Sequence, residues 1–355
     1  MSIAADRLRR PRAPLAGADE VGPIVEWSKN TRSIKIKGEL MRAAGVREIG
    51  GRVELLDLPE PDGPGPEEVL VEVAAAGVGN WDGIVRDGAW NVGLTPPMAL
   101  GVEVAGTVVA VGSKVTNLRP GDEILGHPVP LRHQGCWAER LVVDADLLVL
   151  KPLGVPWDTA AAFPVPALTA EQVLSESLKV AENETLLVHG AGGTTGGLAV
   201  QLAALRGVRV IATSGPSSTA RVVRAGATEV VDYHDSSWPD RVRELTGGVG
   251  VDAAVNAVSG GSADTVLALR AGGRMATITG DPPAAERGIS VADVYVRPDS
   301  AQLEELCLLL GDGRLTLSVG ATLPLAEAAT ALERAVSGAK GGPVVLRIAP
   351  ERTGN

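Results

Sequence analysis

Two patterns of hydrophobic and polar residues divide the chain near residue 165. Before it, residues 53–152 carry short apolar runs broken by glycine and proline, among them VLVEVAAAGV, VEVAGTVVAVG and ERLVVDADLLVLKP. Turn sequences such as Pro120-Gly121-Asp122 separate these runs. Short β-rich runs bounded by turn residues predict an irregular domain that resembles a β-barrel.

After residue 165 the chain alternates between strand and helix patterns. Strands are expected in LLVHG, VRVIATS, TEVVDY, VDAAVNAV and GRMATITG, with helices between them. This alternation predicts an α/β fold, a doubly wound parallel sheet with helices on both faces. Two further helices, near 300–311 and 324–338, lead to the strand PVVLRI, which we expect to return to the first domain.

Residues 1–40 follow neither pattern. They contain RLRRPRAP and scattered glycine and proline, so we expect a loosely ordered extension before a domain that begins at Met41. The predicted organisation is a β-rich domain over 41–164 and 312–349 around an α/β domain over 165–311.

One turn carries a strong functional signal. The strand LLVHG runs into Gly190-Ala191-Gly192-Gly193-Thr194-Thr195-Gly196, and the helix LAVQLAAL follows. Glycines there permit a tight bend and bring the backbone close to a pyrophosphate, which the amino end of the helix attracts. We assign these tasks to Gly190, Gly193 and Gly196, and hydroxyl donation to Thr194 and Thr195. The alternative is a turn without a ligand, but the alternating elements downstream favour dinucleotide binding.

The end of the second strand distinguishes NAD from NADP. A carboxylate about 20 residues past the glycines would pair with the ribose hydroxyls. Instead, the chain has Thr213, Ser214, Ser218 and then Arg221, whose guanidinium can bind a 2′-phosphate. The sequence therefore favours NADPH over NADH. The alternatives are that Arg221 lies on a solvated helix face and that Ser217 only caps this helix.

Composition limits the class of protein. The 355 residues allow two domains, and 45% hydrophobic residues can fill their cores. A formal charge of -10, without a basic cluster beyond the first few dozen residues, disfavours nucleic acid and anionic membrane as partners. No apolar run approaches the roughly 20 residues that span a bilayer, so we expect a cytoplasmic protein. Cys136 and Cys307 form no CxxC pair and are expected to be buried thiols.

Several motifs together resemble the medium-chain dehydrogenase/reductase superfamily, within it the quinone oxidoreductase branch that includes zeta-crystallin. They are AAGVGNWDGIVRDG, GVEVAGTVVAVG, RPGDEI, GCWAE, AAAFPVPALTA, VHGAGGTTGGLAVQLA and GPVVLRI, spread over roughly residues 41–349. The resemblance implies a GroES-like catalytic domain, a Rossmann domain, a cofactor in the cleft between them and a homodimer joined through the Rossmann sheets. It also implies that the nicotinamide is lined by Thr169, Asn256, Val258, Ile278, Thr279 and Gly280.

The chain departs from this family's pattern in ways that bear on metal and cofactor. Zinc-dependent relatives have a metal-binding cysteine in the AAGV motif and a histidine before the glutamate of the GHE motif, where this chain has Gly79 and Val102. Catalytic zinc needs three protein ligands and an open position, so we expect no metal. Many NADPH-dependent relatives have a phosphate-binding lysine where Ser218 stands, and Arg221 and Tyr233 are expected to compensate.

The substrate is expected to be a conjugated carbonyl or a quinone. Enoyl-thioester reductases that resemble this family often place a tyrosine shortly after the AAGV motif, and this chain has Trp90 in that neighbourhood. An indole donates a hydrogen bond but is no general acid near neutral pH, which disfavours thioester reduction by that route. Without a Lewis acid, an enone accepts hydride at its β-carbon while a donor holds the enolate oxygen. Water or a polar side chain then protonates the α-carbon.

Candidate catalytic groups lie in and near the AAGV motif. Asn80 and the cofactor's ribose hydroxyl are candidate donors to the enolate oxygen, and Asp82 is either a proton-relay group or a turn-capping carboxylate. Trp81, Trp90 and Trp137 are candidate pocket walls, with a core position as the alternative.

Two further sets of alternatives stay open. His127, Arg132 and His133 are expected on a loop, where they can meet an acidic substrate group or have no specific role. Rival functions are an NADPH-binding scaffold with little catalysis and, disfavoured by the missing ligands, a zinc alcohol dehydrogenase.

Overall fold

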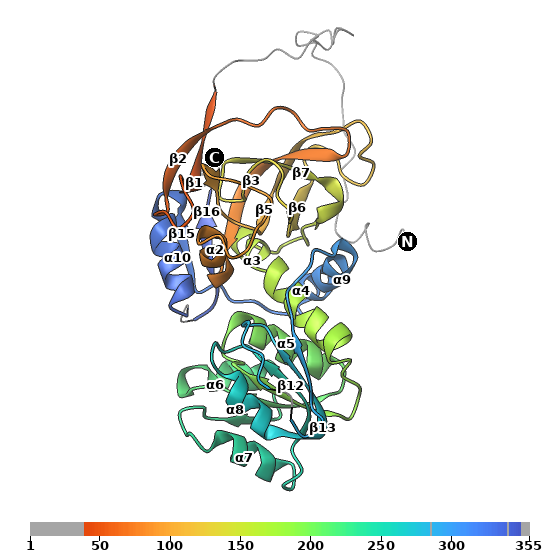
Figure 1. Cartoon of the computed structure of the whole chain (residues 1–355). Helices are drawn as coiled ribbons and strands as arrows, with labels where there is room; N and C mark the ends of the chain where they lie inside the picture. The colour runs from red at the N-terminus through yellow and green to blue at the C-terminus, as the bar shows by residue number, and fades with distance from the viewer. Residues whose placement is uncertain (1–38, 285, 339–340, 349–355) are drawn as a thin grey trace.

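The computed structural model describes residues 39–284, 286–338 and 341–348. The extension predicted over residues 1–40 lies outside the described residues except for its last two positions. The first strand begins at Leu40, one residue before the expected domain start. Figure 1 shows a β-rich lobe above an α/β lobe, which confirms the predicted fold class.

The β-rich lobe contains two sheets. The smaller is antiparallel, in the order β2-β1-β4, with β1 (Leu40–Val46), β2 (Glu54–Pro59) and β4 (Met98–Ala99). The larger runs in the order β15-β16-β3-β5-β6-β8, and β7 also pairs with β3. Its strands are β3 (Glu68–Val78), β5 (Val104–Val111), β6 (Glu123–Gly126), β7 (Arg140–Asp144), β8 (Leu148–Leu150), β15 (Ala321–Pro324) and β16 (Val344–Arg347).

Alternating side chains explain how these strands enclose a core. On β3, Val69, Val71 and Val73 are buried while Glu72 is exposed, because successive side chains point to opposite faces of a strand. Strand β16 comes from the far end of the chain and pairs antiparallel with β3. The last described strand therefore completes the sheet of the first lobe, as its sequence suggested.

The α/β lobe is built on a six-stranded parallel sheet in the order β11-β10-β9-β12-β13-β14. The strands are β9 (Thr185–His189), β10 (Arg209–Thr213), β11 (Glu229–Val231), β12 (Val251–Asn256), β13 (Leu269–Thr277) and β14 (Ser290–Asp293). The chain goes from β9 to β10 on one side and later to β12 on the other. This reversal places a crevice at the carboxyl ends of β9 and β12, where ligands bind in such sheets.

Helices cover both faces of this sheet, so its strands are apolar on both sides. Leu186 and Val188 of β9 belong to one core, and Leu187 between them belongs to the other. The described helices of this lobe and its junction are α4 (Pro164–Gln172), α5 (Thr194–Leu205), α6 (Pro216–Arg224), α7 (Trp238–Leu245), α8 (Ser262–Thr265) and α9 (Ser300–Gly311). Helices α2 (Asn80–Arg86), α3 (Trp157–Ala161) and α10 (Ala328–Val336) pack instead in the β-rich lobe.

Helix α4 joins the lobes. Its side chains are almost all buried, and it packs against α5 and α9. Cys136 and Cys307 are buried free thiols, as predicted. In the described part of the chain, no helix is long and apolar enough to cross a membrane.

Candidate cofactor and substrate site

The glycine-rich turn joins β9 to α5 with the bend that its sequence predicts. Gly190 has a φ of 89°, in the left-handed region that favours glycine. A Cβ on Gly196 would lie 2.3 Å from the carbonyl oxygen of Gly190, so the first turn of α5 packs directly on the start of the turn. Gly193 is the N-cap of α5, and Thr194 and Thr195 are its first two residues. The amino end of the helix is thus placed as phosphate binding requires.

A cavity of about 190 Å³ opens beside this turn. Its walls include Ala191 to Thr194, Arg221 and Arg224 of α6, and the segments 316–318 and 341–343. Two guanidinium groups beside a glycine cradle suit the phosphate groups of a dinucleotide. A Cβ on Gly192 would lie 2.7 Å from the Ser218 hydroxyl oxygen, so the turn and α6 are in close contact. These residues therefore fit a dinucleotide.

The end of β10 carries the residues predicted to choose the cofactor. Arg221 is half-buried, and its Nη2 donates a hydrogen bond to the carbonyl oxygen of Gly192 at 2.5 Å, which excludes the alternative of a solvated helix face. Tyr233 is exposed and stacks on His234, with ring centroids 4.3 Å apart. Helix α6 has Gly215 as its N-cap, so the idea that Ser217 caps it is wrong.

Thr213, the last residue of β10, and Ser214 lie beneath the turn, and the position of Thr213 corrects one predicted contact. Both are buried, Thr213 completely. The Thr213 hydroxyl accepts a hydrogen bond from the Gly190 amide at 3.1 Å and pairs with Nδ1 of His189 at 2.8 Å. Its polar atom is used within the protein, so Thr213 supports the turn and does not present a hydroxyl to a ligand.

The carboxyl ends of β12 and β13 form a polar network. Asn256 is fully buried, and its Nδ2 lies within hydrogen-bond distance of Ser262 Oγ (2.9 Å) and Thr279 Oγ1 (3.0 Å). The Asn256 side chain connects the loops that follow β12 and β13. It is therefore a buried structural residue, whereas it was expected from the sequence to line the nicotinamide. Sequence reasoning also missed Asp281, although polar runs after two adjacent strands, NAVSGGS and TITGD, were visible signals.

The other residues predicted to line the nicotinamide differ in accessibility. Val258, Ile278 and Thr279 are partly exposed and Gly280 is exposed at these strand ends, and Val258 lies beside Gly190. Thr169 is only 7% exposed, and its hydroxyl donates to the carbonyl of Val165 within α4 at 2.6 Å. The Thr169 hydroxyl is therefore already used by its own helix.

Helix α2 carries the predicted catalytic pair. Asn80, its first residue, is exposed, whereas Asp82 is completely buried. Oδ2 of Asp82 accepts a hydrogen bond from the Gly79 amide at 2.8 Å, so the carboxyl group caps the turn, as its alternative interpretation proposed. Burial raises the pKa of Asp82 to about 7, against the opposing influence of the Gly79 and Gly101 amides. Among the described residues, Oδ1 of Asp82 and the buried indole nitrogen of Trp81 have no hydrogen-bond partner.

Trp90 and His127 lie close together in the β-rich lobe, with ring centroids 6.3 Å apart. Trp90 is partly exposed, but His127 is buried, which corrects the prediction of an exposed loop residue. The Nδ1–H of His127 donates to the Val102 carbonyl at 2.6 Å. Burial lowers the pKa of His127 to about 4, so the ring is neutral near pH 7 and its Nε2 carries a lone pair. In the described part of the chain this Nε2 has no partner.

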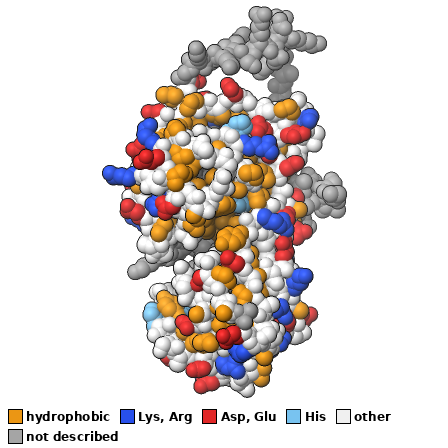
Figure 2. All heavy atoms as spheres, in the orientation of Figure 1, with side chains coloured by type: hydrophobic (Ala, Val, Ile, Leu, Met, Phe, Trp, Pro, Cys, Tyr) orange, Lys and Arg blue, Asp and Glu red, His pale blue; other side chains and the backbone are white. Residues whose placement is uncertain are grey.

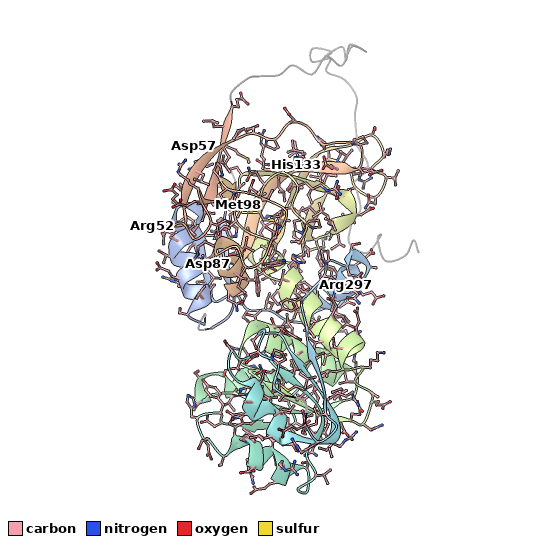
Figure 3. The ribbon with its side chains drawn as sticks, in the orientation of Figure 1. Arg52, Asp57, Asp87, Met98, His133 and Arg297 are labelled. Atoms are coloured by element: carbon pink, nitrogen blue, oxygen red, sulfur yellow. The ribbon has the colours of Figure 1, made fainter. Side chains whose placement is uncertain are left out.

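Three predicted ligand-contacting residues have structural roles instead. Trp137 is fully buried and donates its indole N–H to the Gly77 carbonyl at 3.0 Å, so it is a core residue and not a pocket wall. Arg132 pairs with Asp144 and His133 with Glu68, each at 2.9 Å. Figure 3 shows His133 in the upper part of the β-rich lobe, whereas Asp87, just after α2, lies nearer the α/β lobe.

The region where zinc-dependent relatives bind metal is buried here. Gly79 and Val102 offer no ligand, and Oε2 of Glu103 accepts a hydrogen bond from the Val165 amide at 2.9 Å. Burial raises the pKa of Glu103 well above its ordinary value. Within the residues that the structure describes, no group of three or more His, Cys, Asp or Glu side chains is placed to hold a metal ion.

Comparison with known proteins assigns both lobes. Residues 65–153 match the family of the alcohol dehydrogenase GroES-like domain, and residues 225–346 match the zinc-binding dehydrogenase family. A quinone oxidoreductase of Pseudomonas aeruginosa is 32% identical over 308 residues, which cover 81% of this chain and 93% of that protein.

Solved structures agree with this assignment. An NAD-dependent alcohol dehydrogenase superposes with a TM-score of 0.80 at 32% identity, covering 87% of this chain and 100% of the other. A quinone oxidoreductase of Pseudomonas syringae superposes with a TM-score of 0.78 at 26% identity and the same coverage. The fold and the glycine-rich site thus define a nicotinamide-dependent oxidoreductase. The chain belongs to the medium-chain dehydrogenase/reductase superfamily, in its quinone oxidoreductase branch.

Proposed function

We propose that this oxidoreductase uses NADPH, without zinc, to reduce a conjugated carbonyl or a quinone. The observation that supports the cofactor choice is the segment after β10, which has no carboxylate and in which Ser218 and Arg221 lie against Gly192 of the glycine-rich turn. Tyr233 lies beside Gly215, the N-cap of α6. NADH is the less favoured cofactor, because ribose hydroxyls without a 2′-phosphate would leave Arg221 without an anionic ligand.

The residues of the turn and of the strand ends would hold the cofactor. The backbone from Gly190 to Gly193 and the amino end of α5 would bind the pyrophosphate, and Arg221 would bind the 2′-phosphate. Val258, Ile278 and Gly280 would lie against the nicotinamide. When bound, NADPH supplies the hydride.

The catalytic lobe would orient the acceptor and its developing charge. Asn80 is exposed at the start of α2 and can donate its amide hydrogens to an enolate or quinone oxygen. Trp90 would form one wall for a flat substrate. Figure 2 shows hydrophobic side chains gathered on the face of the β-rich lobe above its junction with the α/β lobe, in keeping with a flat, apolar acceptor.

Conjugated acceptors are favoured because the ligand positions for zinc hold Gly79 and Val102. A simple carbonyl lacks a strong polarising group in such a site, whereas an enone or quinone spreads the negative charge over its own conjugated system. We also propose that the protein acts in the cytoplasm as a homodimer. The dimer is supported by the family resemblance and by the edge position of β14 in its sheet.

The first experiment is to measure the loss of NADPH absorbance with purified protein of known metal content. Quinones, enones, enoyl thioesters and simple aldehydes are tested as acceptors, with NADH in parallel. Oxidation of NADPH by an enone or quinone at substoichiometric zinc supports the proposal. Tight binding of NADPH without turnover of any acceptor would favour a binding scaffold. Turnover that follows zinc content and stops with a chelator would favour a zinc alcohol dehydrogenase.

A further inference from the structure

Asp281 lies directly after the end of β13, in a network that joins two loops. Its Oδ1 accepts hydrogen bonds from the hydroxyls of Thr279 at 2.6 Å, Ser262 at 2.8 Å and Thr277 at 2.9 Å. Its Oδ2 accepts one from the Gly260 amide at 2.8 Å. The donors come from the loop after β12, from α8 and from the end of β13, so the carboxylate is held rigidly between them.

This carboxylate is ionised, and in the described part of the chain its pKa is set by burial and by hydrogen bonds. Partial burial raises the pKa of Asp281, but the hydrogen bonds from Thr279, Ser262, Thr277 and Gly260 outweigh that effect and hold it at about 2. In the described part of the chain, every group that donates a hydrogen bond to Asp281 is uncharged. Hydrogen bonds spread the negative charge but do not cancel it, so a full unit of charge stays at this end of the sheet.

The place of Asp281 relative to a dinucleotide follows from the strand order. The crevice lies between β9 and β12, and the glycine-rich turn after β9 fits the pyrophosphate. The residues suited to the adenosine phosphate, Ser218 and Tyr233, lie toward β10 and β11. The nicotinamide half would therefore extend over β12 and β13, the side on which Asp281 lies.

We propose that Asp281 acts on the nicotinamide ring through its charge. The oxidised ring is positively charged and the reduced ring is neutral, so a fixed carboxylate nearby stabilises bound NADP⁺ relative to bound NADPH. This preference makes bound NADPH a stronger hydride donor. The inference rests on the proposed use of NADPH, and it adds a residue that sets the driving force of the reaction.

The ratio of the dissociation constants for NADP⁺ and NADPH isolates this effect. Any repulsion between Asp281 and the cofactor phosphates is the same in both oxidation states, so it cancels in the ratio. In the full chain, Asp281→Asn keeps the size of the side chain and an oxygen acceptor but removes the charge. We expect the ratio Kd(NADP⁺)/Kd(NADPH), measured by calorimetry, to rise roughly 5-fold, as for the loss of one charge that acts through a partly hydrated site.

Two control variants separate charge from structure. Thr279→Val removes a hydrogen bond from the network but keeps the carboxylate, so the ratio should stay within about 2-fold of the wild-type value even if both affinities change. Asp240→Asn removes an exposed carboxylate from α7 and controls for net charge. Asp281→Ser provides the same neutral test if the asparagine variant does not fold.

The outcomes are distinct. A ratio that rises in the neutral Asp281 variants and in neither control supports the inference. An unchanged ratio in a folded Asp281→Asn protein that binds both cofactor forms overturns the inference and leaves the proposed function standing. A wild-type chain that binds neither form overturns both.

Discussion

Arg221 contacts the glycine-rich turn itself, because its guanidinium donates to the Gly192 carbonyl at 2.5 Å. A guanidinium has five N–H donors, so this bond leaves others for a phosphate. The side chain is held in place by the protein before any ligand binds. Fixed in this way, Arg221 loses little conformational entropy when it binds an anion.

Replacing Arg221 tests the choice between NADPH and NADH. In Arg221→Ala we expect the affinity for NADPH to fall about 10-fold or more, as for a lost charge-assisted hydrogen bond, and the affinity for NADH to fall much less. Fluorescence titration with both cofactors measures this. Arg241→Ala, which removes an exposed arginine of α7 that pairs with Glu244 and lies outside the cavity wall, is the control for net charge. Equal losses for NADPH and NADH would remove Arg221 from the 2′-phosphate site.

Asp82 makes the stability of the protein depend on pH. Burial raises its pKa to about 7 from an unfolded value near 4, so the folded protein binds more protons than the unfolded chain between these values. The contribution of this group to stability is therefore present below about pH 4 and is lost as the pH rises to about 7.

The variant Asp82→Asn keeps an acceptor for the Gly79 amide but cannot ionise. We expect the difference in unfolding free energy between this variant and the wild type to change in favour of the variant by roughly 1 kcal/mol per pH unit as the pH rises from 5 to 7. Urea denaturation at several pH values measures the difference. A difference that does not change with pH would show that Asp82 is not the titrating group.

Trp90 is the aromatic side chain best placed to select the acceptor. It is partly exposed and lies beside His127, whereas Trp137 is buried in the core. In Trp90→Ala we expect the ratio of kcat/KM for a bicyclic quinone over a small enone to fall about 10-fold, since a flat ring loses its stacking surface. The dissociation constant of NADPH should change less than about 2-fold. A loss that is equal for both acceptors would exclude Trp90 from substrate selection.

At the scale of elements, the packing of helix α5 on the glycine-rich turn requires glycine at position 196 more than at position 193. A Cβ on Gly196 would meet the Gly190 carbonyl oxygen at 2.3 Å, but one on Gly193 would meet it at 3.4 Å. Neither residue has a positive φ. The difference is therefore one of packing and not of backbone strain.

The paired variants Gly196→Ala and Gly193→Ala test this contact. Gly196→Ala should lose about 1–3 kcal/mol of unfolding free energy through overpacking, which thermal denaturation registers as a lower Tm. Gly193→Ala should keep a Tm close to that of the wild type. Similar values of Tm for the two variants would contradict the close packing of α5 on the turn.

At the scale of the whole molecule, β14 is the edge of the parallel sheet, and Tyr295 just beyond it is 78% exposed. An open strand edge is a template for pairing with a second chain. We expect the purified protein to have the mass of two 36.4 kDa chains in light scattering. A mass of one chain at micromolar concentration would contradict a homodimer.

The local elements and the class of protein could be predicted from the sequence, because each depends on neighbouring residues. The alternating pattern after residue 165 predicted five of the six strands of the parallel sheet to within a few positions but missed the edge strand β14 (Ser290–Asp293). Helix α9 has the bounds 300–311 that were expected. The glycine spacing predicted the strand, the bend and the helix start around Gly190 for the same reason, since these features are local.

Only the tertiary structure decided which side chains are free to act. His127, Trp137 and Thr213 carry the right chemical groups, but burial and hydrogen bonds to distant residues occupy or enclose them. The Asp281 network joins the ends of two strands that are separate in sequence, so the polar runs after these strands did not by themselves show that their side chains meet. Residue types and local spacing follow from the chain alone, whereas burial, pKa and charge pairing depend on contacts between segments that only folding brings together.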